Sequence, residues 1–305
     1  MKNETKAWLI LIFLSLVWGG SFILMEKSMH PTATTNAFTP YQVGALRILI
    51  ASLILLPIAL KNISKFKGKN LPLFILVGLT GNFIPAFLFP IAETGIQSSL
   101  AGLLNMGTSL FIVILSFLFF KSKISWIQLI GFCLGGIGLF LIVSTQIDLG
   151  ENSFTHAGIA LFATLFYAIS LSLIKFKLSN EHPLTITSLA FFSMLVPAIS
   201  ACFLTGSFTA LAQPDTLKGL PYLIILSLIG TALAVLIFNY MVAISTPLFA
   251  SSVTYIIPIV ALFFGVLDGE KFDLINLIWM TLIFTGVYLM GKKKKNGHKN
   301  KLLLK

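Results

Sequence analysis

Charged residues are scarce in this sequence. Asp, Glu, Lys and Arg make up only 10% of its 305 residues, whereas hydrophobic residues make up 57%. An average soluble domain has about 25% charged residues, which help to cover the surface that it exposes to water. The composition therefore excludes an ordinary soluble domain and indicates an integral membrane protein.

Cysteine and histidine are also rare. The two cysteines, Cys133 and Cys202, lie inside apolar runs and predict neither a disulfide nor a metal site. An enzyme within the membrane needs a nucleophile and a base, or a set of metal ligands, inside the spans. The four histidines instead lie in loops, at the ends of apolar runs or in the C-terminal tail: His30, His156, His182 and His298. We therefore expect no enzyme, no metal and no cofactor.

Alternating strand patterns are absent as well, which argues against a membrane β-barrel. The sequence contains apolar runs close to the roughly 20 residues that a helix needs to cross a bilayer. The prediction is an all-α integral membrane protein with ten transmembrane helices, at residues 8–25, 41–60, 71–91, 98–120, 124–143, 157–174, 184–204, 220–243, 248–267 and 274–290.

Lysines are distributed unevenly among the loops between these runs. If the N-terminus is cytoplasmic, seventeen lysines fall on the cytoplasmic side and three on the outside, with Arg47 inside a span. The positive-inside rule then places both termini in the cytoplasm. The net charge of +11 is thus a signal of topology. It does not indicate nucleic-acid binding, because no folded domain presents these lysines. The polybasic tail at 292–305 is expected to lie against anionic lipid.

Two segments of the sequence repeat one pattern of small and polar residues, spaced i, i+4, i+7 and i+11. The first copy consists of Ser98, Gly102, Asn105 and Ser109. The second copy, 149 residues later, consists of Pro247, Ser251, Thr254 and Pro258. This spacing places each set on one face of a helix. We interpret the two stripes as facing walls of one central pathway.

The same offset of 149 residues relates other helices. Trp18 on helix one matches Tyr167 on helix six, and Gly81 on helix three matches Gly230 on helix eight. The pattern indicates two copies of five helices, at residues 1–146 and 147–291. Because five is odd, the second copy must enter the membrane from the opposite side, which gives an inverted repeat. Inverted repeats provide one packing open to each side of the membrane, so we predict a carrier that works by alternating access.

Four stretches carry a resemblance to a known family: WGGSF at 18–22, ALRILIASLILLP at 45–57, SLAGLLNMGTSLF at 99–111 with FFKSKIS at 119–125, and ASSVTYIIPIVALFFGVLDGE at 250–270. They resemble the EamA family of the drug/metabolite transporter superfamily. The resemblance covers essentially the whole chain. It implies a ten-helix carrier, usually a bacterial exporter of metabolites or amino acids, with a central cavity lined by helices one to four and six to nine.

The first half departs from the pattern of that family. The usual proline on helix four and the glutamate after it are matched here by Ser109 and Ser122, whereas Pro258 and Glu270 keep the pattern in the second half. Pro258 is expected to loosen helix nine locally, where a freed carbonyl is tolerated if it lines a cavity or meets a neighbour.

Arg47 is the one charge well inside a predicted span, about seven residues or roughly 10 Å below its outer end. A charge at that depth usually faces a wet cavity or a partner, so one hypothesis is that Arg47 attracts the carboxylate of an anionic or zwitterionic solute. The alternative is a structural role, in which it snorkels outward or binds carbonyls at a helix break. Three acidic residues at outer helix ends are expected to be solvated end groups: Glu93, Asp268 and Glu270.

Other polar residues inside the spans are, one by one, more often interhelical hydrogen-bonding groups than ligand contacts. Those on the repeated stripes are better candidates, because the stripes mark one face. The candidate solute-pathway residues are Trp18, Arg47, Asn82, Asn105, Ser109, Tyr167, Ser251, Thr254, Tyr255 and Pro258.

We predict a secondary-type transporter that exports a small metabolite, such as an amino acid or a related compound, across the bacterial cytoplasmic membrane. The alternative is a drug or nucleobase and purine efflux carrier, while a channel suits the mixed polar stripes less well. The expected partners are a small-molecule solute and the lipid bilayer. Gly131 and Gly135 form a GxxxG motif for close helix packing. A partner helix in the same chain, and hence a monomer, is favoured over a second subunit.

Overall fold

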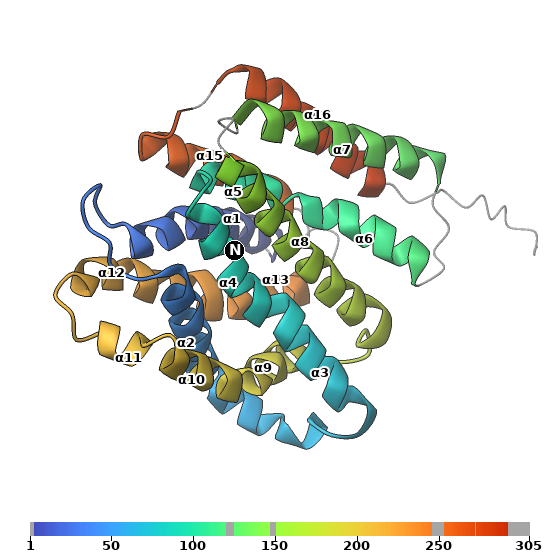
Figure 1. Ribbon diagram of the computed structural model, residues 1–305. Helices are drawn as coiled ribbons and strands as arrows, with labels where there is room; N and C mark the ends of the chain where they lie inside the picture. The colour runs from blue at the N-terminus through green and yellow to red at the C-terminus, as the bar shows by residue number, and fades with distance from the viewer. Residues whose placement is uncertain (1–2, 120–124, 147–150, 246–252, 272, 292–305) are drawn as a thin grey trace, which may run out of the picture.

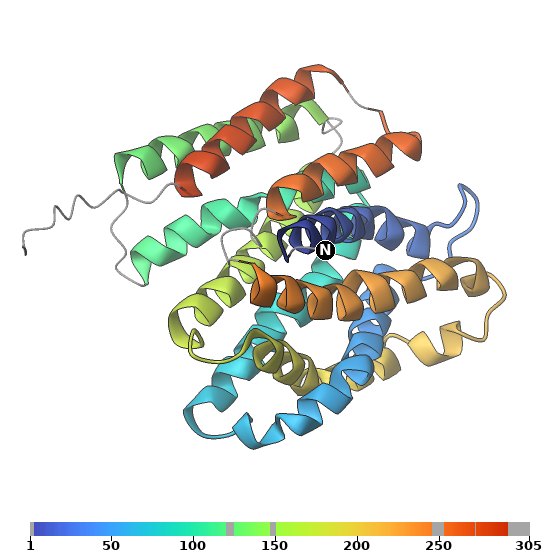
Figure 2. The same cartoon turned by 180° about the vertical axis from the view of Figure 1, so that it is seen from behind.

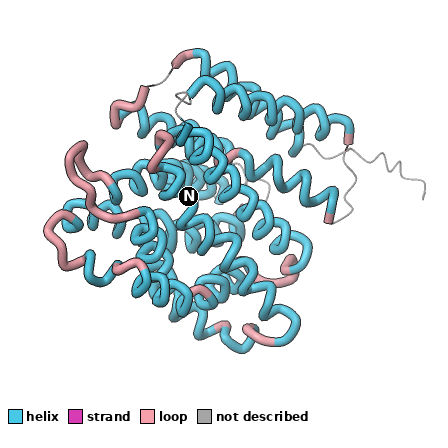
Figure 3. Tube along the Cα trace, in the orientation of Figure 1, coloured by secondary structure: helices cyan, strands magenta, loops and turns pink. Residues whose placement is uncertain are grey.

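Helices and loops make up the structure. A computed structural model describes residues 3–119, 125–146, 151–245, 253–271 and 273–291, and these contain no strand (Figure 3). The prediction of an all-α protein is confirmed for these residues. The apolar composition drives this outcome, because a helix pairs its backbone groups within its own segment.

The helices of the first half are α1 (Asn3–Met29), α2 (Pro40–Lys61), α3 (Leu71–Gly78), α4 (Ile84–Glu93), α5 (Ser98–Leu104), α6 (Gly107–Leu118) and α7 (Trp126–Gln146). The 3₁₀ turns η1 (Ile63–Lys65) and η2 (Gly68–Asn70) follow α2, and the π-helical turn η3 (Leu79–Phe83) joins α3 to α4.

The helices of the second half are α8 (Glu151–Lys177), α9 (Pro183–Ser193), α10 (Leu195–Leu204), α11 (Ser207–Ala210), α12 (Thr216–Ser227), α13 (Ala234–Ile244), α15 (Val253–Leu267) and α16 (Ile275–Gly291). A second π-helical turn, η4 (Leu228–Leu233), joins α12 to α13.

Eight helical segments within the described residues are long and apolar enough to cross a membrane. Two further apolar helices, α15 and α16, are shorter. Each of the ten predicted runs overlaps one of these segments. The chain is therefore an integral membrane protein, and the count of ten spans stays a prediction.

The helices α7 and α16 lie side by side along one edge of the molecule (Figures 1 and 2). Glycines allow their backbones to approach closely, because a Cβ atom on Gly286 would collide with the backbone of Gly131 and Gly135. Close approach through small residues is a common way to pack helices in membranes. Near the other end of the pair, Thr145 Oγ1 donates a hydrogen bond to Asn276 Oδ1 at 2.8 Å. The GxxxG motif of α7 thus packs on a helix of the same chain.

Two of the spans contain a break between helices. α9 ends and α10 begins around Met194, three residues before Pro197, whose ring cannot follow a regular helical turn. α5 ends and α6 begins around Asn105 and Met106, where the sequence has no proline. In contrast, α15 continues through Pro258, so the expected loosening there does not interrupt the helix.

The two π-helical turns occupy corresponding positions in the two halves. η3 and η4 begin 149 residues apart, which is the offset found in the sequence. Each turn packs a glycine against a serine of the other half: Gly81 against Ser170 on α8, and Gly230 against Ser21 on α1. These two serines are also 149 residues apart. π-helical turns are rare and often lie at functional sites.

We predict that Gly286→Ala lowers the thermal stability of the purified protein, because the new methyl group would push α16 away from α7. Overpacking of this kind costs about 1–3 kcal/mol. Gly136→Ala is the matched control on the same helix pair, since a Cβ atom there meets no other atom within 4 Å. The control should keep or raise the melting temperature, and equal melting temperatures for the two variants would contradict the packing argument.

Candidate functional site

Arg47 extends from α2 towards the π-helical turn η4 and towards α1. Its Nε donates a hydrogen bond to Thr231 Oγ1 at 3.0 Å, and its Nη1 lies 3.4 Å from Met25 Sδ. Thr231 Oγ1 in turn donates to the carbonyl oxygen of Leu226 at 3.0 Å. Arg47 on α2 therefore contacts both α1 and η4, the π-helical turn between α12 and α13. A guanidinium group has more N–H donors than these two contacts use.

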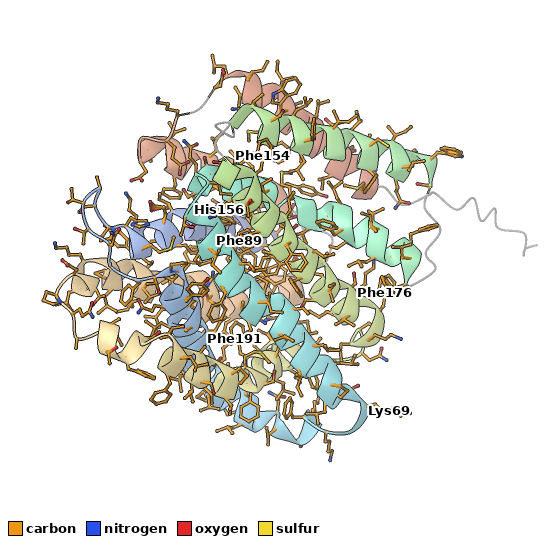
Figure 4. All side chains as sticks on the ribbon, in the orientation of Figure 1. Lys69, Phe89, Phe154, His156, Phe176 and Phe191 are labelled. Carbon is orange, nitrogen blue, oxygen red and sulfur yellow. The ribbon has the colours of Figure 1, made fainter. Side chains whose placement is uncertain are left out.

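Aromatic side chains connect α1, α4 and α8 in the interior. Phe89 on α4 is labelled in Figure 4. Its ring makes an edge contact with Phe22 at 5.5 Å between ring centroids, and it stacks on Tyr167 at 5.8 Å. Trp18 packs against Phe238 on α13, with centroids 5.4 Å apart. Tyr167 is also within electrostatic range of Arg47. The two aromatic candidates, Trp18 and Tyr167, are thus partly buried, and each packs on a ring of the other half.

The break between α5 and α6 carries two unpaired polar atoms. Asn105 Oδ1 and Thr108 Oγ1 are buried and have no hydrogen-bond partner among the described residues. The backbone here is tightly wound, because the N–H of Ser109 donates to the carbonyl oxygen of Met106 at 3.0 Å. Interrupted helices with free polar groups commonly face a cavity or a ligand in transporters. Asn105 thus retains its place among the candidates, and Thr108 joins it.

The remaining candidates are spread over two helices. Asn82 lies within the π-helical turn η3. On α15, Thr254 is exposed, Tyr255 is partly buried and Pro258 is buried. Ser251 lies outside the described residues. The small face of α5 packs directly on α15, because a Cβ atom on Gly102 would collide with Ala261. At this level Gly102 of the first stripe packs on Ala261, which is not a member of the second stripe, and the central pathway between the stripes stays a prediction.

An acidic cavity of about 420 Å³ lies where the C-terminal ends of α1, α4 and α15 meet the N-terminus of α5. Four carboxylates line it, together with the loop that joins α4 to α5: Glu26, Glu93, Asp268 and Glu270. A second, apolar cavity of about 180 Å³ lies between α1, α12 and α15, beside Gly20, Gly230 and Phe264. None of the predicted pathway residues lines either of these two cavities.

Glu270 caps helix α5 from the other half of the chain. Its Oε1 accepts hydrogen bonds from Ser98 N at 2.9 Å and from Ser98 Oγ at 2.6 Å, and its Oε2 accepts one from Ser99 N at 3.1 Å. Free N–H groups and a partial positive charge at a helix N-terminus both favour a carboxylate there. Glu270 is therefore a structural residue, and the stripe residue Ser98 is part of the same cap.

The end of α15 is shaped to present this carboxylate. Gly269 has a φ of +91°, and its N–H donates to the carbonyl oxygen of Val266 at 3.1 Å. The N–H of Glu270 donates to the carbonyl oxygen of Gly265 at 2.9 Å. Together these bonds form a Schellman motif, which reverses the chain after a helix. A Cβ atom on Gly265 would collide with the returning Glu270 carboxylate and with Ser99.

The other carboxylates of the acidic cavity differ in how well they are paired. Asp268 Oδ1 forms an ion pair with Lys27 Nζ at 2.7 Å. Glu93 is only 6% exposed, and neither of its carboxylate oxygens has a hydrogen-bond partner among the described residues. One oxygen of Glu26 is also buried and unpaired. The prediction that these are solvated end groups is wrong for Glu93, which is buried, and for Glu270, which forms a cap.

Sequence reasoning missed this cavity because its walls come from distant parts of the chain. One signal was available: Asp268-Gly269-Glu270 directly follows an apolar helix, and glycine after a helix indicates a Schellman motif. The burial of Glu93 depends on α1, α5 and the end of α15, which no local pattern indicates.

The fold and this arrangement of polar groups define a polytopic, all-helical membrane protein, and comparison with known families gives its place among them. The EamA-like transporter family model matches residues 5–144 and 156–292. The chain belongs to the EamA-like transporter family. The resemblance stated from the sequence is thereby confirmed.

Several curated relatives of this chain are named as transporters or efflux pumps. An "Uncharacterized transporter" of Archaeoglobus fulgidus is 25% identical over 95% of this chain and 100% of its own length. The "Probable amino-acid metabolite efflux pump" of Escherichia coli is 22% identical over 93% of this chain and 94% of its own length. A solved crystal structure has the same fold, with a TM-score of 0.59 over 94% of this chain and 96% of that chain, at 14% identity.

We predict that Glu270→Ala lowers the melting temperature of the protein, because three hydrogen bonds at the start of α5 lose their acceptor. The loss of an N-terminal cap typically costs about 0.5–2 kcal/mol. Asp215→Ala is the control: Asp215 is the residue before α12, but its side chain makes no capping hydrogen bond there and has only an exposed ion pair with Lys218. The control should change stability by less than about 0.5 kcal/mol. A stable Glu270→Ala protein would show that the cap is dispensable.

Proposed function

We propose that this protein is a secondary-type transporter that exports a small metabolite, such as an amino acid or a related compound. Alternating access would move the solute across a bacterial cytoplasmic membrane, with both termini in the cytoplasm. The family assignment supports transport, and one relative is named as an amino-acid metabolite efflux pump.

The observation that carries the mechanism is the matching pair of π-helical turns. Each turn packs its glycine on a serine of the other half, and both partners obey the offset of 149 residues. This reciprocity supports an inverted repeat of two five-helix units, at 1–146 and 147–291. Two units with near-equivalent contacts can exchange packings, which is the basis of alternating access.

The location of Arg47 supports a solute site at the junction of the halves. Arg47 on α2 bonds to Thr231 in η4, so its charge lies between the first unit and the second. We infer that its unused N–H donors attract an anionic group of the solute. The unpaired Asn105 Oδ1 and Thr108 Oγ1 at the break between α5 and α6 offer acceptors for a donor group. A zwitterionic solute has both kinds of group.

A drug or nucleobase carrier is the second candidate. The rings of Trp18 and Tyr167 are only partly buried and provide aromatic faces that suit planar rings. Solutes from both classes therefore belong in the same screen. A channel would conduct without saturation, which the transport kinetics distinguish.

We predict saturable counterflow in proteoliposomes that contain the purified protein. Vesicles preloaded with an unlabelled solute should accumulate the labelled form transiently, because a carrier exchanges one bound solute for another. Amino acids and nucleobases are screened in parallel, with empty liposomes as the control. Flux that rises linearly with concentration, without counterflow, would contradict a carrier.

We predict that Arg47→Gln reduces transport, since a hydrogen bond to a charged group contributes about 1.5–3 kcal/mol. That loss corresponds to roughly a ten- to hundred-fold increase in the solute KM. Thr231→Val is the matched control, because it removes the protein acceptor of Arg47 Nε but keeps the guanidinium charge. If both variants lose stability and transport equally, Arg47 has only a structural role. Unchanged transport and abundance in Arg47→Gln would also reject the solute contact.

A further inference from the structure

Glu93 stands apart from the other carboxylates of the acidic cavity. It is the last residue of α4, it lines the cavity, and it is 6% exposed. Both of its carboxylate oxygens lack a hydrogen-bond partner among the described residues. Glu270 lines the same cavity but accepts three hydrogen bonds. Asp268 has the ammonium group of Lys27 as its partner.

The groups around Glu93 come from several elements. Glu26 on α1 and Glu270 after α15 lie close enough to repel a negative charge on Glu93, and Arg47 on α2 lies close enough to attract it. His156 on α8 lies directly against Gly95, two residues beyond Glu93. Tyr167, lower on α8, stacks on Phe89, one helical turn before Glu93. Arg47 forms no ion pair with Glu93 in the described structure, because its contacts go to Thr231 and Met25.

A buried carboxylate with no hydrogen-bond donor is costly as an anion, and nearby negative charges increase that cost. Such a group either binds a cation or takes up a proton. No three His, Cys, Asp or Glu side chains converge to hold a metal ion within the described parts of the chain. A proton needs only one carboxylate oxygen. The geometry therefore favours a proton as the occupant of Glu93.

We propose that Glu93 is a proton-binding site that couples proton movement to solute transport, an inference that rests on the proposed transport function. The proton enters from water in the acidic cavity, binds one Glu93 oxygen, and leaves as the same ion after the cavity opens to the other side. No other bond forms or breaks in this step.

Arg47 is the residue that connects proton binding at Glu93 with binding of the solute. When Glu93 is ionised, its negative charge competes with Thr231 and with an anionic solute for the guanidinium of Arg47. When Glu93 is protonated, that competition ends and Arg47 is available to the solute. Proton binding and solute binding thus affect each other through one shared charge, and such a coupling is necessarily reciprocal.

Infrared difference spectroscopy of the full-length protein in liposomes tests the proton site without a transport assay. At neutral pH the wild type should show the carbonyl band of a protonated carboxylic acid, with a frequency that shifts in D₂O. Glu93→Gln should lose this band. Glu181→Gln is the matched control and should keep it, because Glu181 is paired with Lys65 at 3.1 Å near the surface. A band that persists in Glu93→Gln would overturn the proposal.

Two further measurements separate the remaining outcomes. Loss of the band in NaCl but not in choline chloride would show a bound metal cation and would overturn the proton assignment. If Glu93→Gln does not fold, Glu93→Asp is measured instead and should keep the carbonyl band at a shifted frequency. A Glu93→Asp spectrum identical to that of the wild type would overturn the proposal.

Transport provides the second readout. An imposed pH gradient should accelerate solute flux in wild-type and Glu181→Gln proteoliposomes, and this acceleration should be lost in Glu93→Gln. Equal acceleration in Glu93→Gln would reject the coupling. If no solute is transported by any variant, the transport function fails, while the infrared result still decides whether Glu93 binds a proton.

Discussion

Pairing of backbone polar groups without water is the constraint on which this structure depends. In a bilayer, each helix end and each irregular turn must find partners inside the protein. The cap on α5 meets this need across the two halves, since one carboxylate of Glu270 accepts hydrogen bonds from both Ser98 and Ser99. The cap fixes the start of α5 against the end of α15. It also brings two acidic helix ends, those of α1 and α4, to the same place.

The cap explains why the four carboxylates of the acidic cavity are not equivalent. Glu270 is held by N–H groups at a helix N-terminus, and Asp268 is held by Lys27. These two stabilise the fold and have their charges balanced. Glu93 and one oxygen of Glu26 have no such partners among the described residues. The structural role of Glu270 and Asp268 therefore leaves Glu93 as the carboxylate for the proposed proton site.

Much of the fold follows from the sequence, but the site follows only in part. Apolar runs indicate the helices, because length and hydropathy alone decide whether a segment can span a membrane. The offset of 149 residues reappears in the two π-helical turns. The turns themselves could not be predicted, since they depend on glycines that meet serines of the other half. No proline near Asn105 indicates the break between α5 and α6. Glu93 lines a cavity with residues that are far away in the sequence, such as Glu26 and Glu270.

The π-helical turns η3 and η4 have matching glycine–serine contacts, but only η4 has an arginine as a partner. Under the proposed inverted repeat, Arg47 corresponds to Val196 and Thr231 corresponds to Asn82. Val196 is 71% exposed on the outer surface of the bundle, so the η3 turn has no arginine that mirrors the bond between Arg47 and η4. Exchange of packings between the halves would therefore break or move this bond without an equivalent one to replace it. If the halves exchange packings as proposed, the two end states would differ in energy for that reason, and the charge on Glu93 would change the difference.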